Sequence, residues 1–193
     1  MDGKPASQIP NRATAPAGLT SGTVDFPSLY KQEFGYAWRT LRRLGVRESD
    51  LPDLAHDFFI VVFRHLGDYD PSRPIRPWLF GIAFRVVSDY RRSARIARET
   101  MGDTPEIADR APPADDQIAD RQAREAVVRV LEQLDLDRRA VLVMHDLDGH
   151  PVPEIAAALA IPVATAYSRL RLAREDLAAA IKRLRAREEG RRV

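Results

Sequence analysis

Hydroxyl and guanidinium side chains gather on one predicted helix near the C-terminus, where they could bond to nucleic acid. The set is Thr165, Ser168, Arg169, Arg171 and Arg174. On a helix these side chains lie opposite an apolar stripe of Ala166, Leu170 and Ala173, which recur at i, i+4 and i+7. Such groups on an exposed helix suit a DNA major groove, because they can bond base edges and phosphates. The spacing therefore predicts a DNA-reading helix.

A second, shorter helix is predicted immediately before it. Ile155, Ala156 and Leu159 share helical spacing, and the three residues from Ala160 to Pro162 follow as a turn. The proline cannot continue the first helix, and its fixed φ suits entry into the next one. Two helices joined by so tight a turn form a helix-turn-helix, so we expect the chain to act on DNA.

Length and composition bound the possible architectures. A chain of 193 residues can form one large domain or two small ones, and 14 prolines indicate interruptions. The absence of cysteine excludes disulfides and thiolate metal ligands. The N-terminus has no signal-type apolar stretch, and no run of 18 apolar residues occurs anywhere. We therefore expect a soluble, cytoplasmic protein without membrane insertion.

Charge is unevenly distributed, although the net charge is only +2. Residues 85–98 contain five arginines against one aspartate, and residues 163–192 contain nine basic against four acidic residues. Residues 99–125, between these two segments, contain eight acidic and three basic residues. Two basic segments separated by an acidic one indicate two nucleic-acid contacts rather than one uniformly basic surface.

The elements that position these segments are predicted to be helical throughout. Helices are expected over residues 26–44, from a cap at Ser49 or Asp50 to Gly67, and over residues 77–97, 115–134 and 137–147. Gly45 ends the first of them, and three prolines between residues 70 and 77 indicate a loop. Residues 1–25 are predicted to be disordered, and residues 99–114 read as a polar linker. The expected fold is all-α, with two small helical domains on a flexible linker and the helix-turn-helix in the second.

Five segments carry recognisable motifs in a fixed order. They are DLAHDFF at residues 53–59, WLFGIA at 78–83 with DYRR at 89–92, LDLDRRAVL at 134–142, EIA at 154–156 and VATAYSRL at 163–170. These segments resemble DLVQEVF, WLYRIA, LPERQREVL, EIA and VGTVKSRL of bacterial RNA polymerase sigma factors of the extracytoplasmic-function (ECF) type, in the sigma-70 family. One helix-turn-helix alone is a weak signal, whereas five segments matched in order are a specific one.

The resemblance implies a division of the chain and a function. The implied segments are an N-terminal extension (1–25), sigma region 2 (26–98), a linker (99–114), sigma region 4 (115–187) and a tail (188–193). A chain so built would bind core RNA polymerase, recognise the –35 and –10 promoter elements with separate domains and melt the DNA. The polymerase would supply the chemistry, so no catalysis is expected of this chain. An anti-sigma factor is a further implied partner.

The resemblance also implies which residues meet each partner. Those matching the polymerase-binding positions are Asp53, His56, Asp57 and Arg64. Those matching the –10 positions are Tyr69, Arg73, Ile75, Arg76, Arg85, Arg91 and Arg92. Those matching the –35 positions are Thr165, Tyr167, Ser168, Arg169, Arg171 and Arg174. Apolar and aromatic groups could hold an unstacked base, while cations bind the backbone. On the residues alone, the polymerase-binding set is equally well explained as a solvated helix face.

Several positions depart from the family pattern. His56 stands where the family has Gln, Ile75 where many relatives have an aromatic residue, and Arg85 where Asn is frequent. The departures at Ile75 and Arg85 affect which –10 sequence would be recognised, but not the expected recognition and melting of a –10 element. Trp78 falls in helical register with Ile82, which favours a core position over a platform for a base.

Two other functions remain open on the residues alone. A stand-alone regulator would bind a palindrome as a dimer without polymerase, using the first domain for sensing or dimerisation. A hydrolytic enzyme with an appended helix-turn-helix would need a nucleophile and base, and no candidate pair stands out. The four histidines include no i, i+4 pair of the kind that forms a helical metal site, so neither metal nor cofactor is expected.

Overall fold

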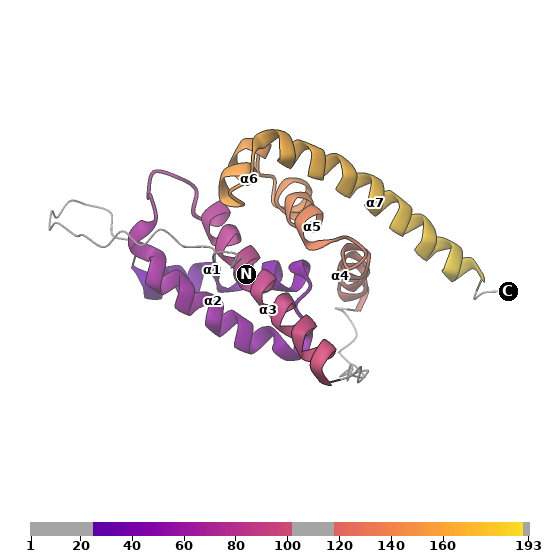
Figure 1. Cartoon of the computed structure of the whole chain (residues 1–193), viewed down its shortest axis with the longest axis horizontal. Coiled ribbons are helices and arrows are strands. Elements are labelled where there is room, and N and C mark those ends of the chain that lie inside the picture. The colour runs from indigo at the N-terminus through magenta and orange to yellow at the C-terminus, as the bar shows by residue number, and fades with distance from the viewer. Residues whose placement is uncertain (1–24, 102–117, 191–193) are drawn as a thin grey trace, which may run out of the picture.

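The computed structural model describes residues 25–101 and 118–190, and within them it contains helices and no strand. The first group of helices comprises α1 (Phe26–Leu44), α2 (Leu51–His65) and α3 (Ile75–Met101). The second group comprises α4 (Ile118–Leu131), α5 (Leu136–Leu142), α6 (Val152–Ala158) and α7 (Val163–Gly190). The two groups lie side by side, and the C-terminal half of α7 extends away from both (Figure 1). The N-terminal extension, most of the predicted linker and the last residues of the tail lie outside the described residues.

The first helix begins and ends at residues that the sequence marks. Asp25 precedes α1, and its carboxylate accepts a hydrogen bond from the Ser28 amide at 3.1 Å. Gly45 follows α1 with φ of 95°, a left-handed conformation that glycine adopts without steric cost. The prediction that Gly45 ends this helix is confirmed.

The next two helices depart from their predicted boundaries and caps. Asp50 occupies the position before α2, but its side chain makes no capping bond there. Its carboxylate instead accepts hydrogen bonds from the Tyr90 hydroxyl on α3 (2.5 Å) and from the Ser49 hydroxyl (2.9 Å). Asp50 therefore bonds to a residue of another helix, α3, instead of capping α2. α3 begins at Ile75, two residues before the expected start, because Pro77 is tolerated in a first helical turn.

The predicted helix over residues 137–147 is divided in two. Asp135 caps α5 by accepting from the Arg138 amide at 3.0 Å. After Leu142 the backbone changes to a short π-helical segment, Val143–Leu147, with Asp148 N–H bonded to Val143 C=O at 3.0 Å. π-Helical turns are rare and widen the helix locally. The segment ends at Leu147 and is followed by Asp148 and by Gly149, whose φ is 77°.

The two groups of helices share one hydrophobic core. α3 packs against α6, and α1 packs against α4 and α5. Buried residues such as Leu44 and Leu79 of the first group belong to the same cluster as Val141 and Ile155 of the second. The sequence predicted two helical domains on a flexible linker and did not address their contact. Such packing depends on complementary surfaces, which periodicity within one helix does not reveal.

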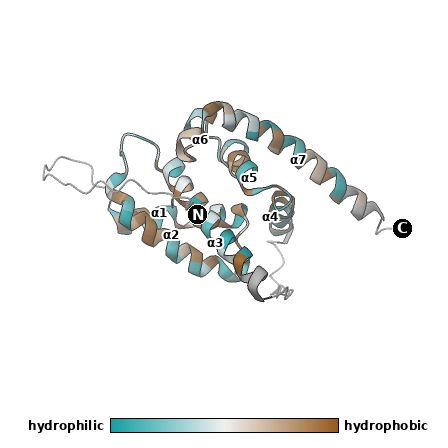
Figure 2. Ribbon diagram, viewed as in Figure 1, coloured by the Kyte–Doolittle hydropathy of each residue, from teal (hydrophilic) through white to brown (hydrophobic). Residues whose placement is uncertain are grey.

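Polar and apolar side chains are mixed along the longest helices. Figure 2 shows hydrophilic and hydrophobic residues following one another along α7. No single helix in the described part of the chain is long and apolar enough to cross a membrane. α6 and α7 meet that requirement only when joined across a bend of 108°.

Candidate nucleic-acid interface

The N-terminal half of α7 presents a polar face to the surface. Its buried stripe is the predicted one, Ala166, Leu170 and Ala173, each at most 5 % exposed. On the other side Tyr167 is 57 % exposed and Ser168 is exposed beside it, while Thr165 is half-buried. The side chains that could read base edges therefore point away from α5 and α6.

A tight turn fixes the angle between α6 and α7 at 108°. Ala160 adopts φ of 53°, and the Ile161 N–H reaches back to Ala156 C=O at 2.9 Å. This is the bonding pattern of a helix that ends in a left-handed residue, a position where glycine is usual. The crossing angle lies in the range of DNA-binding helix-turn-helix motifs, so the predicted motif is present.

Arg169 and Arg174 join α7 to the elements beneath it. Arg169 donates to the Asp137 carboxylate on α5 at 2.6 Å, and Arg174 donates to the Asp146 carboxylate at 2.6 Å. The hydrogen bond from Arg174 lowers the pKa of Asp146, and His145 adds to the effect. Arg169 is only 25 % exposed, whereas Arg174 is 52 % exposed. Arg174 can therefore turn toward a phosphate more readily than Arg169, which chiefly positions α7.

Arg171 lies at the exposed centre of the same face. Its guanidinium donates to Glu175 one turn along α7 at 2.6 Å, and both side chains are more than half exposed. Exposed ion pairs of this kind contribute little to stability. A phosphate or guanine that accepts two bonds from an arginine can therefore replace Glu175 as its partner.

The loop before α3 carries a pair of aromatic rings. Tyr69 and Trp78 lie with ring centroids 5.2 Å apart, and the Tyr69 hydroxyl donates to Arg73 C=O at 2.5 Å. Asp70 stabilises the loop by accepting from both the amide and the hydroxyl of Ser72, at 3.0 and 2.7 Å. Both rings are half-buried, and Trp78 packs against the core, as its register predicts. The loop thus places two half-buried rings beside the start of α3.

Arg76, in the first turn of α3, is held by two partners. Its Nε donates to Glu33 on α1 at 3.0 Å, and its guanidinium lies 5.1 Å from the centroid of the Tyr36 ring. The Glu33 side chain is only 11 % exposed, whereas that of Arg76 is 53 % exposed. The cation is therefore fixed in place while one side of it still faces solvent.

The other arginines of α3 lie further along the helix. Arg85 and Arg92 are exposed and two turns apart, which places them on one face. Arg91 is half-buried and, with Arg47, Tyr90 and Arg95, lines a polar hollow of about 270 Å³ beside Gly45. Ile75 is half-buried at the start of the same helix. The predicted –10 set is thus spread along the loop and α3 rather than gathered in one pocket.

The outer face of α2 carries the predicted protein-binding residues. Asp53, Asp57 and Arg64 fall on one stripe of the helix, with His56 beside it, and all four are exposed. The opposite face is buried in the first group of helices, with Phe58 and Val62 fully enclosed. The stripe is therefore free to meet another protein.

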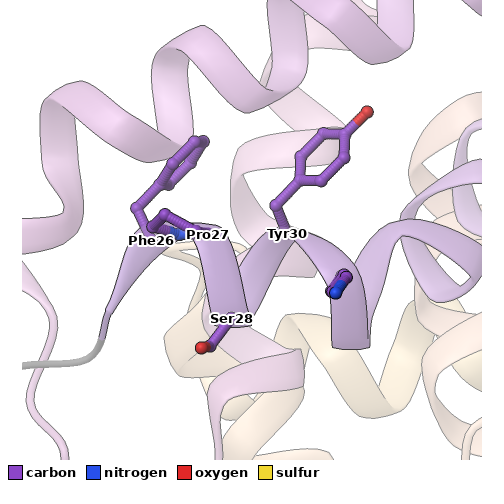
Figure 3. Close-up of a pocket in the computed structure, with 5 residues that line it drawn as sticks. Phe26, Pro27, Ser28 and Tyr30 are labelled. Carbon is purple, nitrogen blue, oxygen red and sulfur yellow. The ribbon is translucent and has the colours of Figure 1, made fainter.

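An aromatic cluster lies next to that stripe. Phe26, Tyr30 and Phe34 of α1 pack on Phe59 and Phe63 of α2, and the Tyr30 and Phe59 centroids are 4.6 Å apart. Phe63 is 63 % exposed. Figure 3 shows Phe26 and Tyr30 on one side of α1 and Ser28 on the other. These residues line an open hollow of about 620 Å³. The cluster is an apolar surface rather than an enclosed ligand site.

Comparison with known proteins identifies the family. Sigma-70 region 2 matches residues 29–96, and sigma-70 region 4 matches residues 124–177. The RNA polymerase sigma factor CnrH of Cupriavidus metallidurans is 33 % identical over 146 residues, covering 72 % of this chain and 76 % of CnrH. The ECF sigma factor SigL of Mycobacterium tuberculosis is 30 % identical over 149 residues, covering 76 % and 82 %. The chain belongs to the ECF sigma factors of the sigma-70 family.

Solved structures resemble this sigma factor across both groups of helices. CnrH in complex with the cytosolic domain of CnrY matches with a TM-score of 0.58 at 28 % identity, covering 81 % of this chain and 87 % of that one. RpoE of Bartonella quintana, in complex with the anti-sigma factor NepR, matches with a TM-score of 0.63, covering 81 % and 96 %. Its identity of 19 % shows a common fold alone.

As an ECF sigma factor, the chain directs promoter-specific initiation of transcription by RNA polymerase. We call α1–α3 region 2 and α4–α7 region 4. The match to region 2 disfavours a stand-alone regulator, in which the first domain would be a sensory or dimerisation module.

Some residues that shape the interface were missed by sequence reasoning. Glu33, Asp137 and Asp146 each hold an arginine of the predicted sets, yet lie 28 to 43 residues from it. Spacing within one helix cannot reveal such partners. Arg139 is 1 % exposed. Its burial could have been predicted from the sequence, because it shares helical register with the apolar Leu136.

Proposed function

We propose that the N-terminal half of α7 binds the –35 element in the major groove. Tyr167, Ser168 and Arg171 would face the bases, with Thr165 at the edge of the contact. Arg174 would bind a phosphate, and Arg169 would hold α7 in position. The exposed polar face over a buried apolar stripe, in a helix pair crossing at 108°, is the observation that carries this assignment.

Region 2 would bind and melt the –10 element. The half-buried Tyr69 and Ile75 border the loop before α3, where an unstacked base could lie against the Tyr69 ring. Arg73 and Arg76 flank that loop, and Arg85, Arg91 and Arg92 would bind phosphates along α3. A fixed cation such as Arg76 loses little conformational freedom on binding, which favours its use beside a separated strand.

Core polymerase would dock on the outer face of α2 through Asp53, His56, Asp57 and Arg64. The stripe joins acidic and basic side chains, so a partner surface of complementary charge is expected. The sigma factor would contribute recognition and strand separation, and the polymerase would contribute catalysis. We place this activity in the cytoplasm, together with the polymerase. The division of the chain into an extension, two regions, a linker and a tail stays a prediction from the sequence.

An anti-sigma factor is the third proposed partner. One solved relative described above is bound to the cytosolic domain of CnrY, and the other is bound to the anti-sigma factor NepR. The aromatic cluster around Phe59 and Phe63 offers exposed apolar area next to the polymerase-docking stripe. A partner seated there would compete with polymerase, which is the simplest way to restrain initiation.

Run-off transcription with purified core polymerase tests these roles separately. Arg171→Ala should lower initiation from the cognate promoter about five- to 150-fold, as expected for loss of a base contact worth about 1–3 kcal/mol. Glu175→Ala removes the competing partner of Arg171 and should leave initiation unchanged or raise it. Lys182→Ala, an exposed cation further along α7, serves as the matched control.

Polymerase binding supplies the complementary arm of the test. Asp53→Arg combined with Asp57→Arg should abolish association with core polymerase, while Arg171→Ala should leave that association intact. If Arg171→Ala reduced polymerase binding instead, α7 would not be the –35 reader proposed here. Unchanged polymerase affinity in the double variant would remove the docking role of α2.

A further inference from the structure

The residues that begin α7 are apolar, although this end of the helix is proposed to lie in the major groove. Val163, the first residue of α7, is 43 % exposed, and Tyr167, one turn along, is 57 % exposed. Ala164 is exposed between them. In helix-turn-helix proteins the N-terminal residues of the second helix contact base edges. We call Val163, Ala164 and Tyr167 the apolar tip.

The apolar tip lies in line with Arg171. Val163, Tyr167 and Arg171 are spaced at i, i+4 and i+8, so their side chains follow one another along α7. The buried stripe lies on a different side of the helix, where α7 packs on α5 and α6. When α7 lies in a groove of DNA, all three exposed side chains therefore reach that groove.

Within the described residues, the other exposed large apolar side chains of region 4 lie in a different setting. Val127 on α4, Leu147 after α5 and Ile181 on α7 border a groove of about 290 Å³. A groove of this kind can receive an apolar element of a partner protein. No residue of the apolar tip lines that groove, and the start of α7 lies at the periphery of the molecule (Figure 1). The tip is therefore suited to enter a groove rather than to form one.

The base edges in the major groove offer the apolar tip one kind of apolar group. All base pairs present hydrogen-bond donors and acceptors there, and only thymine adds a methyl group, at C5. The side chains of Val163 and Ala164 contain neither donor nor acceptor. Placed against a polar base edge, they would displace water without replacing its hydrogen bonds, which is unfavourable. Contact with a thymine methyl group is therefore the favourable interaction that a base edge can give them.

We propose that the apolar tip reads thymine methyl groups in the –35 element, with Val163 on one thymine and the ring of Tyr167 on another. Ala164 completes the apolar surface between them. This inference rests on the proposed function of α7. It adds Val163 to the base-reading residues and assigns a chemical partner to Tyr167. Arg171, further along the helix, would pair with guanine.

Helix geometry sets the spacing of the bases that these residues meet. Four residues of α-helix advance about 6 Å, and base pairs of B-form DNA rise about 3.4 Å each. The thymines that contact Val163 and Tyr167 should therefore lie about two base steps apart, on either strand. The guanine that pairs with Arg171 should lie about two steps further in the same direction.

Selection from a randomised –35 element tests this pattern. The full chain and core polymerase would be mixed with the cognate promoter carrying a randomised –35 element, and templates from heparin-resistant complexes would be sequenced. Wild type should enrich thymine at two positions. Val163→Ala should remove the preference at one of them and Tyr167→Ala at the other, while α7 persists because alanine favours a helix. Val127→Ala, a valine of 44 % exposure on α4, is the matched control and should leave the selected bases unchanged.

Deoxyuridine in place of thymine removes the methyl group and leaves every hydrogen-bonding group of the base pair unchanged. Substitution at either selected position should weaken formation of the complex by about fourfold, as expected for one buried methyl group. The loss should vanish in the variant that lacks the contacting side chain, which is Val163→Ala at one position and Tyr167→Ala at the other. This coupling distinguishes a direct contact from a general weakening of the complex.

The outcomes separate this inference from the proposed function of α7. Absence of thymine at the selected positions, or selected thymines that tolerate deoxyuridine without loss, would overturn the inference. Weaker polymerase binding by Val163→Ala with unchanged base selection would also overturn it, because the tip would then contact protein. In each of these cases, guanine selection that depends on Arg171 would leave the proposed function standing. Loss of all base selection across the –35 element in wild type would remove that function, and the inference with it.

Discussion

At the residue scale, the exposed cations of region 4 were predictable, but their partners were not. Helical spacing placed Arg169, Arg171 and Arg174 opposite the buried stripe of α7. Only the structure shows that Arg169 bonds to Asp137 and that Arg174 bonds to Asp146, because those carboxylates lie on other elements. Two of three cations that look alike in sequence therefore also hold α7 in place.

The pKa of Asp146 gives a prediction for pH. Its folded pKa is lowered, chiefly by the hydrogen bond from Arg174, so the carboxylate stabilises the fold above its unfolded pKa of about 3.9. This stabilisation is lost as the pH falls through the lowered value. Asp146→Asn should therefore lower the melting temperature by a few degrees at pH 6 and by less at pH 3. An equal difference at both pH values in scanning calorimetry would show that the charge is not responsible.

At the element scale, the order and type of the helices could be read from periodicity, whereas several boundaries could not. The sequence located the turn at residues 160–162 and the end of α1 at Gly45. It missed the π-helical segment after α5, because nothing in the pattern of Val143 and Met144 distinguishes it from an α-helix. The hydrogen bond from Tyr90 on α3 also takes the Asp50 carboxylate away from its expected role as the cap of α2.

The left-handed residue in the helix-turn-helix gives a prediction of stability. Ala160 is exposed and has φ of 53°, where a non-glycine residue is strained by about 1–2 kcal/mol. Glycine relieves the strain but loses about 0.4–1 kcal/mol through greater freedom of the unfolded chain. Ala160→Gly should therefore stabilise the protein by about 0.5–1 kcal/mol and raise the melting temperature by about 1–4 °C. Thermal unfolding with Ala179→Gly, an exposed mid-helix position that should lose about 1 kcal/mol, provides the comparison.

At the scale of the whole molecule, the family and the all-α fold could be predicted, but the packing of one region on the other could not. Composition and motif order indicated two helical domains with separate DNA contacts. Their shared core depends on matched surfaces of α1, α3, α5 and α6, which no segment encodes alone. Gly81 is an example, because the sequence around a glycine inside a helix does not reveal that another backbone segment packs against it.

The shared core predicts cooperative unfolding of the free chain. Because Leu44 and Val141 belong to one buried cluster, regions 2 and 4 should unfold in a single calorimetric transition. Gly81→Ala combined with Asp148→Ala, which removes an acceptor for the Tyr36 hydroxyl of region 2, should divide it into two transitions, one for each region. Two transitions already present in wild type would indicate that the regions are energetically independent.

Nuclease and permanganate footprinting of promoter DNA, with the sigma factor alone and with core polymerase, tests the central claim most directly. The account predicts two protected segments, at –35 and –10, and reactive unpaired bases at –10 only when polymerase is present. Protection of an inverted repeat by the sigma factor alone, with no change on adding polymerase, would contradict it.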